Sequence, residues 1–115
     1  MGKDTSRRTG FPLSQQEFLI LASLAAGPKH GYAIAKDVLE LTDGKVKFSA
    51  ATLYENLSEL LDKGFIERAG DKEVEPGERR KTYRITAEGA TVLNEQLGIL
   101  QKAQAAIPRL LPDVS

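Results

Sequence analysis

From Ser14 onward, the chain alternates between stretches in which apolar residues recur at helical spacing and short polar breaks. The first stretch opens with Ser14-Gln15-Gln16-Glu17, which has the spacing of a capping box, and ends at Gly27-Pro28. The second follows His30-Gly31, which we interpret as a turn, and ends at Thr42-Asp43-Gly44. These patterns predict two short helices joined by a turn.

A third apolar stretch predicts a helix with one well-defined buried face. Ser49 is a favourable N-cap residue, and Gly64 suits the left-handed conformation that ends a helix. The residues that share the apolar side are Ala50, Leu53, Leu57, Leu60 and Leu61. The helical step of about 100° places on the opposite side Ala51, Thr52, Glu55, Ser58, Glu59 and Asp62, with Tyr54 and Asn56 at the flanks.

The remaining pattern predicts a hairpin and a long helix. Phe65 to Arg68 alternates as a short strand, and Lys81 to Ile85 alternates as a returning strand with Tyr83 and Ile85 on one face. A charged, glycine-containing stretch from Gly70 to Glu78 is expected to be a loop between them. Thr86 is expected to cap a last helix that extends to about Pro108, a length of about 33 Å.

The order of these elements predicts a mainly α fold with a small β-hairpin, a winged helix-turn-helix followed by a C-terminal dimerisation helix. The expected divisions are a flexible N-terminal arm at residues 1–13, the winged helix-turn-helix domain at 14–85, the dimerisation helix at 86–108 and a C-terminal tail at 109–115. In this architecture the third helix presents its outer side and N-terminus to the major groove of DNA, and the hairpin reaches along the backbone.

Composition narrows the class of protein. A chain of 115 residues with 41% hydrophobic content can bury one core. Without Cys and with a single His, it has neither a disulfide framework nor a Cys- or His-based metal site. The sequence shows no nucleophile–base pair and no phosphate-binding loop, so we expect no enzyme, no catalytic residue and no cofactor. It shows no signal peptide and no bilayer-spanning apolar run, so we expect a cytoplasmic protein without a membrane partner.

The placement of charge indicates nucleic acid, although 16 basic and 16 acidic residues cancel. The run from Arg79 to Arg84 is basic and contains no acid, and it lies beside the predicted third helix; taken alone, such a run is also typical of a solvated surface. The positions expected to contact DNA are Tyr32, Lys36, Ser49, Ala51, Thr52, Tyr54, Glu55, Arg79, Arg80, Lys81 and Arg84. Ser49 has the alternative role of a cap alone. His30 is expected to pack or hydrogen-bond at the turn, with pH sensing as the alternative.

The last helix carries an apolar seam with heptad-like steps, formed by Ala90, Leu93, Leu97, Leu100 and Ile107. This seam could pack on the first helix of its own domain. Its length favours a homodimer instead, because the outer half would otherwise expose its apolar stripe to water. The predicted dimer interface adds Phe18 and Leu21 from the first helix. A two-fold dimer would match a palindromic operator.

Several motifs in register resemble the PadR family of bacterial and archaeal transcriptional regulators over residues 14–107. They are Gly27 to Tyr32, Ser49 to Tyr54, Gly64 to Ile66 and Tyr83 to Gly89. The resemblance implies a dimeric winged-helix repressor of the compact branch, with a single helix after the hairpin and release by a small-molecule effector such as a phenolic acid or a drug. The absence of Trp argues against a pocket that sandwiches flat aromatic compounds, and Glu55 departs from the basic or neutral residue more usual after the Tyr.

Two classes of function therefore compete. The first is a sequence-specific DNA-binding regulator that occupies a promoter. The alternative is a winged-helix domain used for protein–protein association without specific DNA binding, which the neutral charge and the acidic side of the third helix would fit. Salt dependence separates them, because DNA binding weakens steeply between low and moderate salt and an apolar protein interface does not.

Overall fold

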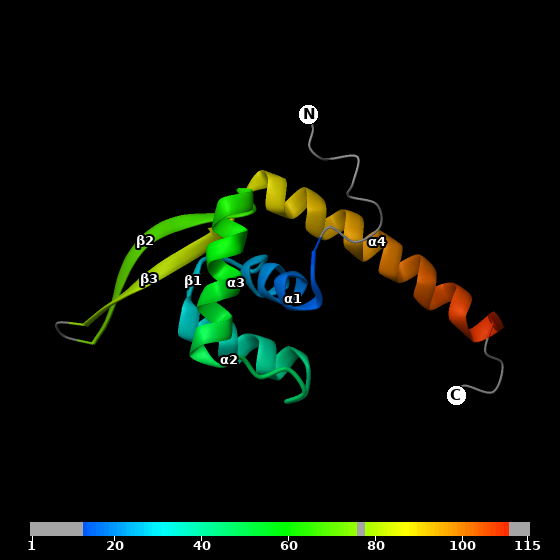
Figure 1. Cartoon of the computed structure of the whole chain (residues 1–115), viewed down its shortest axis with the longest axis horizontal. Helices are drawn as coiled ribbons and strands as arrows, with labels where there is room; N and C mark the ends of the chain where they lie inside the picture. The colour runs from blue at the N-terminus through cyan, green and yellow to red at the C-terminus, as the bar shows by residue number, and fades with distance from the viewer. Residues whose placement is uncertain (1–12, 76–77, 111–115) are drawn as a thin grey trace.

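The computed structural model describes residues 13–75 and 78–110. The helices are α1 (Gln15–Leu24), α2 (Gly31–Leu41), α3 (Ala50–Lys63) and α4 (Ala87–Leu110), and the strands are β1 (Lys29–His30), β2 (Ile66–Glu75) and β3 (Glu78–Ile85). Helices α1 to α3 pack together, the β2–β3 hairpin projects to one side and α4 extends to the other (Figure 1). The mainly helical winged helix-turn-helix prediction is confirmed.

The predicted helix boundaries at Ser14, Ser49 and Gly64 are confirmed by capping geometry. The Glu17 N–H donates to Ser14 Oγ at 3.1 Å, and the Ser14 N–H donates to Glu17 Oε1 at 3.0 Å, which completes the capping box. The Thr52 N–H donates to Ser49 Oγ at 3.1 Å. Gly64 adopts a left-handed conformation with φ of 78°, which a residue with a side chain adopts only with strain.

The predicted turn at His30 is wrong in one respect, because Lys29 and His30 form a third strand. In β1, Lys29 pairs with Tyr83 and His30 with Thr82, so the sheet is antiparallel in the order β1-β3-β2. A two-residue strand has no periodicity, so its partner strand rather than its own sequence defines it. The His30 Nδ1 accepts a hydrogen bond from the Ala33 N–H at 3.2 Å, which confirms the expected hydrogen-bonding role at the start of α2.

The hairpin is longer than its apolar pattern predicts. Most of the expected loop from Gly70 to Glu78 belongs to β2, and its last described pair is Glu75 with Glu78. In this part of the register Asp71 pairs with Lys81, Lys72 with Arg80 and Glu73 with Arg79. These positions are charged on both strands and show no apolar alternation, which explains why the hydrophobic pattern missed the pairing. Residues 76–77 at the tip lie outside the described residues.

One apolar core joins the three short helices to the sheet and to the first half of α4. Its fully buried side chains include Ile20, Leu24, Ile34, Val38, Leu57, Leu60 and Ile66. Two predictions for α3 are corrected. Ala50 is exposed because it lies in the first turn, before the helix reaches the core. Asn56 is only 8% exposed, and its amide donates to the Thr52 carbonyl at 2.9 Å and to Gln16 Oε1 at 3.3 Å.

Helix α4 begins as predicted and ends two residues later than expected, at Leu110, with Pro108 inside its last turn. The Gly89 N–H donates to Thr86 Oγ1 at 3.1 Å, so Thr86 acts as the cap. Gly89 permits close packing, because a Cβ there would lie 2.1 Å from the Phe65 carbonyl oxygen. Beyond this anchored start, the apolar side chains of Leu97, Ile99, Leu100 and Ile107 are exposed.

The predicted N-terminal arm is shorter at its inner end, because Leu13 is part of the core. Residues 1–12 of that arm and residues 111–115 of the predicted tail lie outside the described residues, while Arg109 and Leu110 continue α4. None of the helices that the structure describes combines the length and apolar character needed to cross a membrane. Within residues 13–75 and 78–110, no three His, Asp or Glu side chains gather as a metal site would require.

Candidate nucleic-acid interface

The outer side of α3 is exposed over most of its length, as predicted. Ala51, Tyr54 and Glu55 are exposed, and Thr52 is partly exposed. Ser49 Oγ donates to Thr52 Oγ1 at 3.0 Å in addition to accepting the Thr52 N–H, so the Ser49 hydroxyl already serves the helix as a cap. The structure therefore supports the capping role of Ser49.

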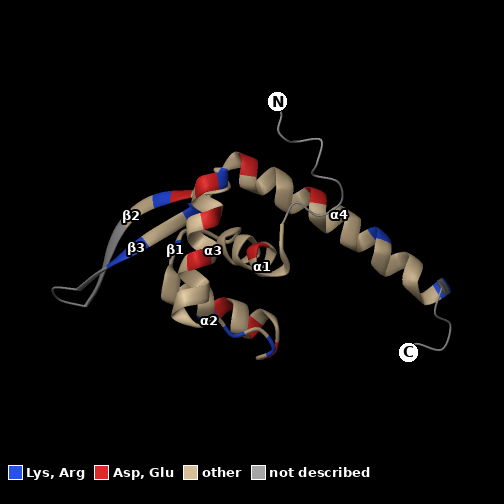
Figure 2. Cartoon of the chain, viewed as in Figure 1, with Lys and Arg blue, Asp and Glu red and all other residues tan. Residues whose placement is uncertain are grey.

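The ribbon of α3 contains acidic residues at several points, and the described part of the hairpin contains basic residues together with the acidic Glu67 (Figure 2). Along α3 these acids are Glu55, Glu59 and Asp62, all exposed. The outer side of α3 therefore carries no acidic residue in its first turn and several acidic residues further along. A polyanion is repelled least at the N-terminal end, where the helix dipole also favours negative charge.

Polar contacts with α1 hold α3 in place. The Lys63 ammonium, 41% exposed, lies 2.9 Å from Glu17 Oε2, whose side chain is 4% exposed. The Glu17 carboxylate thus serves both the α1 capping box and an ion pair with the last turn of α3. In the middle of α3, the Asn56 amide donates to Gln16 Oε1 at 3.3 Å. These contacts orient the outer side of α3 relative to the rest of the domain.

Four of the predicted DNA-contacting residues line one cavity of about 380 Å³ beside α3. Tyr32 comes from the start of α2, Tyr54 from α3, and Arg80 and Lys81 from β3. Gly31 completes the lining and was not predicted as a site residue. Among the described side chains, those that line this cavity include two bases and no acid, so they favour an anion.

Arg80 lies over an aromatic ring in this cavity. Its guanidinium carbon is 5.5 Å from the centroid of the Tyr32 ring, which is cation–π geometry. Tyr32 is 68% exposed, so the ring supports Arg80 from the solvent side of α2. This contact links two predicted site residues that are far apart in the sequence.

A second cavity of about 310 Å³ lies along the other side of Tyr32. It is lined by Tyr32, Ala35, Lys36, Leu39, Lys47 and Phe48. Lys36 was predicted as a DNA contact, and the structure places it here rather than beside Arg80. Lys47 was not predicted, although it precedes the Ser49 cap by two positions, and that short spacing was the available signal.

Arg84, a predicted phosphate contact, is not among the residues that line this cavity. Arg84 Nε is 2.7 Å from Glu67 Oε2, and both side chains are half exposed. Exposed pairs of this kind contribute at most about 1 kcal/mol. Arg79 pairs with Glu73 in the hairpin ladder, and its side chain lies outside the described ones.

The predicted dimer residues divide between surface and core. Leu21 has no exposed surface and Leu93 is also buried, so both pack inside their own chain, and the predicted interface is corrected at these two positions. Leu97, Leu100 and Ile107 are exposed along α4, while Phe18 and Ala90 are half-buried. These five positions remain predictions for contacts with a second copy.

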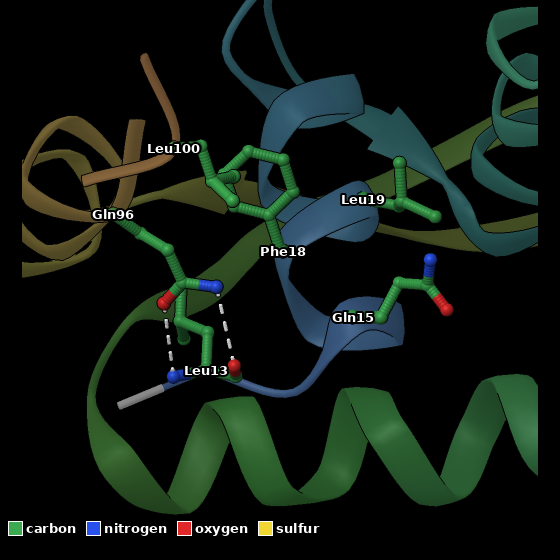
Figure 3. A pocket seen from close by; sticks show the side chains of 6 residues that line it. All are labelled: Leu13, Gln15, Phe18, Leu19, Gln96 and Leu100. Carbon is green, nitrogen blue, oxygen red and sulfur yellow. Dashed lines mark hydrogen bonds between the residues drawn. The ribbon is translucent and has the colours of Figure 1, made fainter. Parts of the chain in front are cut away.

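An apolar cavity of about 400 Å³ lies between α1 and α4 (Figure 3). It is lined by Leu13, Gln15, Phe18, Leu19, Gln96 and Leu100. The Gln96 amide is occupied by two hydrogen bonds to the Leu13 backbone, so the polar group at this end of the cavity is already satisfied. The cavity therefore suits an apolar occupant.

Three short helices, a three-stranded sheet ending in a hairpin and a long C-terminal helix define a winged helix-turn-helix protein. A model of the PadR-like family of transcriptional regulators matches residues 20–95. The chain belongs to this family of transcriptional regulators and not to a family of enzymes.

Individual relatives support this assignment. An uncharacterized protein of Lysinibacillus sphaericus is 34% identical over 77 residues, which are 67% of this chain and 70% of that protein. A PadR family regulator of Clostridium difficile is 27% identical with a TM-score of 0.71, over 85% of this chain and 99% of that one. Bacillus subtilis PadR, crystallised with operator DNA, is 26% identical with a TM-score of 0.65, over 75% of this chain and 48% of that one.

Proposed function

We propose that this protein regulates transcription in the cytoplasm by binding double-stranded operator DNA through the N-terminal half of α3 and the adjoining cavity. The observation that carries the proposal is the meeting of Tyr32, Tyr54, Arg80 and Lys81 from α2, α3 and β3 in one cavity, where two of the four side chains are basic. In a winged helix-turn-helix, α3 enters the major groove and the hairpin follows the backbone. Bacillus subtilis PadR, a protein with this fold, was crystallised in complex with operator DNA, which supports operator DNA as the partner.

Basic side chains surround the N-terminal end of α3 on both sides. Arg80 and Lys81 lie on the hairpin side, and Lys36 and Lys47 lie on the α2 side. Each phosphate that such a side chain neutralises releases counterions, which adds affinity and salt dependence. Local basic clusters of this kind allow a chain with no net charge to bind DNA at one surface.

We propose that the DNA-binding form is a homodimer built on α1 and α4. The exposed Leu97, Leu100 and Ile107 require a cover, and a second copy of α4 supplies a matching apolar seam. A two-fold axis would present two copies of α3 to the half-sites of a palindromic operator. Occupying a promoter in this way represses transcription by blocking access to it.

Release by a small-molecule effector is part of the proposal, as the family resemblance implies. The cavity between α1 and α4 supports it, because Phe18, Leu19 and Leu100 line a space of about 400 Å³ beside the proposed dimer helices. A ligand there would alter how the two copies pack and hence the separation of the two α3 helices. An apolar molecule suits this lining.

One observation favours the alternative function, protein–protein association without specific DNA binding. Glu55, Glu59 and Asp62 are all exposed on the outer side of α3, and that side would fit a basic protein partner. Such a partner would contact the C-terminal part of α3, away from the cavity that Arg80 and Lys81 line.

The test is binding of the purified protein to the DNA upstream of its own coding region, measured by fluorescence anisotropy at low and moderate salt. We expect affinity to fall by orders of magnitude as salt rises, and Tyr54→Ala and Arg80→Ala to weaken binding by about tenfold each. Lys102→Ala, an exposed lysine on α4, is the control and should bind as the wild type does. Equal affinity of all these proteins would show that the proposed surface is wrong.

A further inference from the structure

Gly31, the first residue of α2, lies directly against the hydroxyl of Tyr54. A Cβ built on Gly31 would be 2.8 Å from Tyr54 Oη and 3.1 Å from Tyr54 Cζ. Side-chain Cβ atoms essentially never approach other heavy atoms below 3.0 Å. The backbone of Gly31 is not left-handed, so conformational freedom does not explain the glycine, and close contact with the tyrosine does.

Because Gly31 has no side chain, the Tyr54 hydroxyl can lie against the start of α2. Tyr54 is 49% exposed on α3, and its ring reaches across to the first turn of α2, where the hydroxyl lines the same cavity as Arg80 and Lys81. Tyr83 lies nearby, since the Tyr54 phenol raises the pKa of Tyr83 in addition to the larger effect of burial. With a methyl group at position 31, the end of the Tyr54 ring would have to move, which displaces the hydroxyl from its present position in the cavity.

The donors around this cavity match a phosphate. A phenol hydroxyl, a guanidinium and an ammonium line it, and Arg80 is held over the Tyr32 ring. Each of these groups donates hydrogen bonds, and two carry positive charge, as the oxygens of a phosphodiester require. The two cationic side chains in the described lining favour an anion over a divalent cation, which prefers oxygen ligands.

We infer that Gly31 is a positioning residue. It places the Tyr54 hydroxyl beside Arg80 and Lys81, and together these groups form a binding site for a single backbone phosphodiester of duplex DNA. This inference rests on the proposed function and adds to it a defined ligand and a residue that touches no DNA itself. It explains why a glycine opens α2, where alanine would stabilise the helix better.

The test compares Gly31→Ala, Tyr54→Phe and the double variant with Gly98→Ala, which adds the same methyl group on α4 where nothing lies within 4 Å. Affinity for operator DNA is measured by fluorescence anisotropy, and thermal unfolding checks the fold. We expect Gly31→Ala and Tyr54→Phe each to weaken binding by about tenfold or more, since each removes one hydrogen bond to a charged group. The affinity of the double variant should equal that of whichever single variant binds less tightly, because both changes remove the same contact. Gly98→Ala should bind as the wild type does.

Operator duplexes with a neutral methylphosphonate at one backbone position at a time identify the phosphate. We expect one position per half-site at which the methylphosphonate strongly weakens DNA binding by the wild type. At that position it should weaken binding by Tyr54→Phe and Gly31→Ala much less. Lys81→Gln should lower the slope of log affinity against log salt by about one. Because Tyr54→Phe adds no atom, it keeps this test usable even where Gly31→Ala unfolds.

The outcomes separate the two proposals. A wild type without salt-dependent DNA binding overturns the proposed function and this inference together. A wild type that binds DNA, with Gly31→Ala folded and equal to it, overturns the inference alone. So does a methylphosphonate profile that is the same for the wild type and Tyr54→Phe.

Discussion

The side-chain amide of Gln96 makes two hydrogen bonds to the backbone of Leu13, 83 residues earlier in the chain. The Leu13 N–H donates to Gln96 Oε1 and the Gln96 Nε2 donates to the Leu13 carbonyl, each at 3.2 Å. Both residues are buried at one end of the cavity between α1 and α4 (Figure 3). This pair attaches the segment before α1 to α4 and so fixes the angle at which α4 leaves the domain.

Gln96→Ala should therefore lower the free energy of unfolding by about 1 to 3 kcal/mol, because it leaves a buried N–H and a buried carbonyl without partners. Urea denaturation followed by circular dichroism measures this loss. Gln101→Ala, an exposed glutamine on the same helix, is the control and should change stability by less than about 0.5 kcal/mol. Equal stability of the two variants would show that the Gln96 hydrogen bonds do not hold α4.

Lys63→Met should destabilise the fold by about 1 to 2 kcal/mol, because it leaves the buried Glu17 carboxylate without its ion-pair partner. The partial exposure of Lys63 keeps this loss below that of a fully buried pair. Arg84→Met removes the half-exposed pair with Glu67 and should change the unfolding free energy by less than about 1 kcal/mol. A ranking of the two variants in the opposite order would contradict the assignment of Glu17 as the anchor of α3.

The pH dependence of stability should include a contribution from Tyr83. Burial, with a smaller effect of Tyr54, raises the pKa of the Tyr83 phenol above 10.0, and Arg68 opposes this in part. In the unfolded chain the phenol loses its proton near pH 10 while the folded chain still holds it, so the unfolding free energy falls as pH rises above about 10. Urea denaturation at pH 8 and pH 10.5 should show a smaller fall for Tyr83→Phe than for the wild type. An identical fall in both proteins would rule out this contribution.

Glu55→Gln should strengthen binding to DNA of unrelated sequence by a few fold, because Glu55 is an exposed acid near the end of α3 that we propose enters the groove. Anisotropy titrations with a non-operator duplex at low salt measure this change. Glu95→Gln removes the same charge from an exposed position on α4 and should leave the affinity unchanged. If Glu55 instead accepts a hydrogen bond from a base, affinity for the operator will fall while affinity for unrelated DNA rises.

Leu100→Glu should shift the protein from dimer to monomer, because it places a charge in the apolar surface that the proposed second copy covers. Light scattering coupled to size-exclusion chromatography over a range of concentrations measures the oligomeric state. Gln101→Glu changes the neighbouring exposed residue and should leave the dimer intact. A wild type that stays monomeric at high concentration would exclude the proposed dimer.

Local signals in the sequence determined most of the fold. The capping box at Ser14, the cap at Ser49 and the left-handed Gly64 each depend on a few neighbouring residues, so their positions could be read directly and all are confirmed. The leucine-rich side of α3 could be predicted for the same reason, since helical periodicity is a local property. The basic run ending at Arg84 also marked the strand that supplies Arg80 and Lys81 to the cavity.

Only the tertiary structure decided the contacts between residues that lie far apart in the sequence. Strand β1 exists only because β3 pairs with it, and the outer part of the hairpin pairs through charged positions that no apolar pattern reveals. The burial of Leu21 within its own chain, the Gln96 bonds to Leu13 and the contact of Gly31 with Tyr54 follow from how the elements pack. A sequence pattern shows which side of a helix is apolar, but the partner that covers it is chosen by the packing of the whole chain.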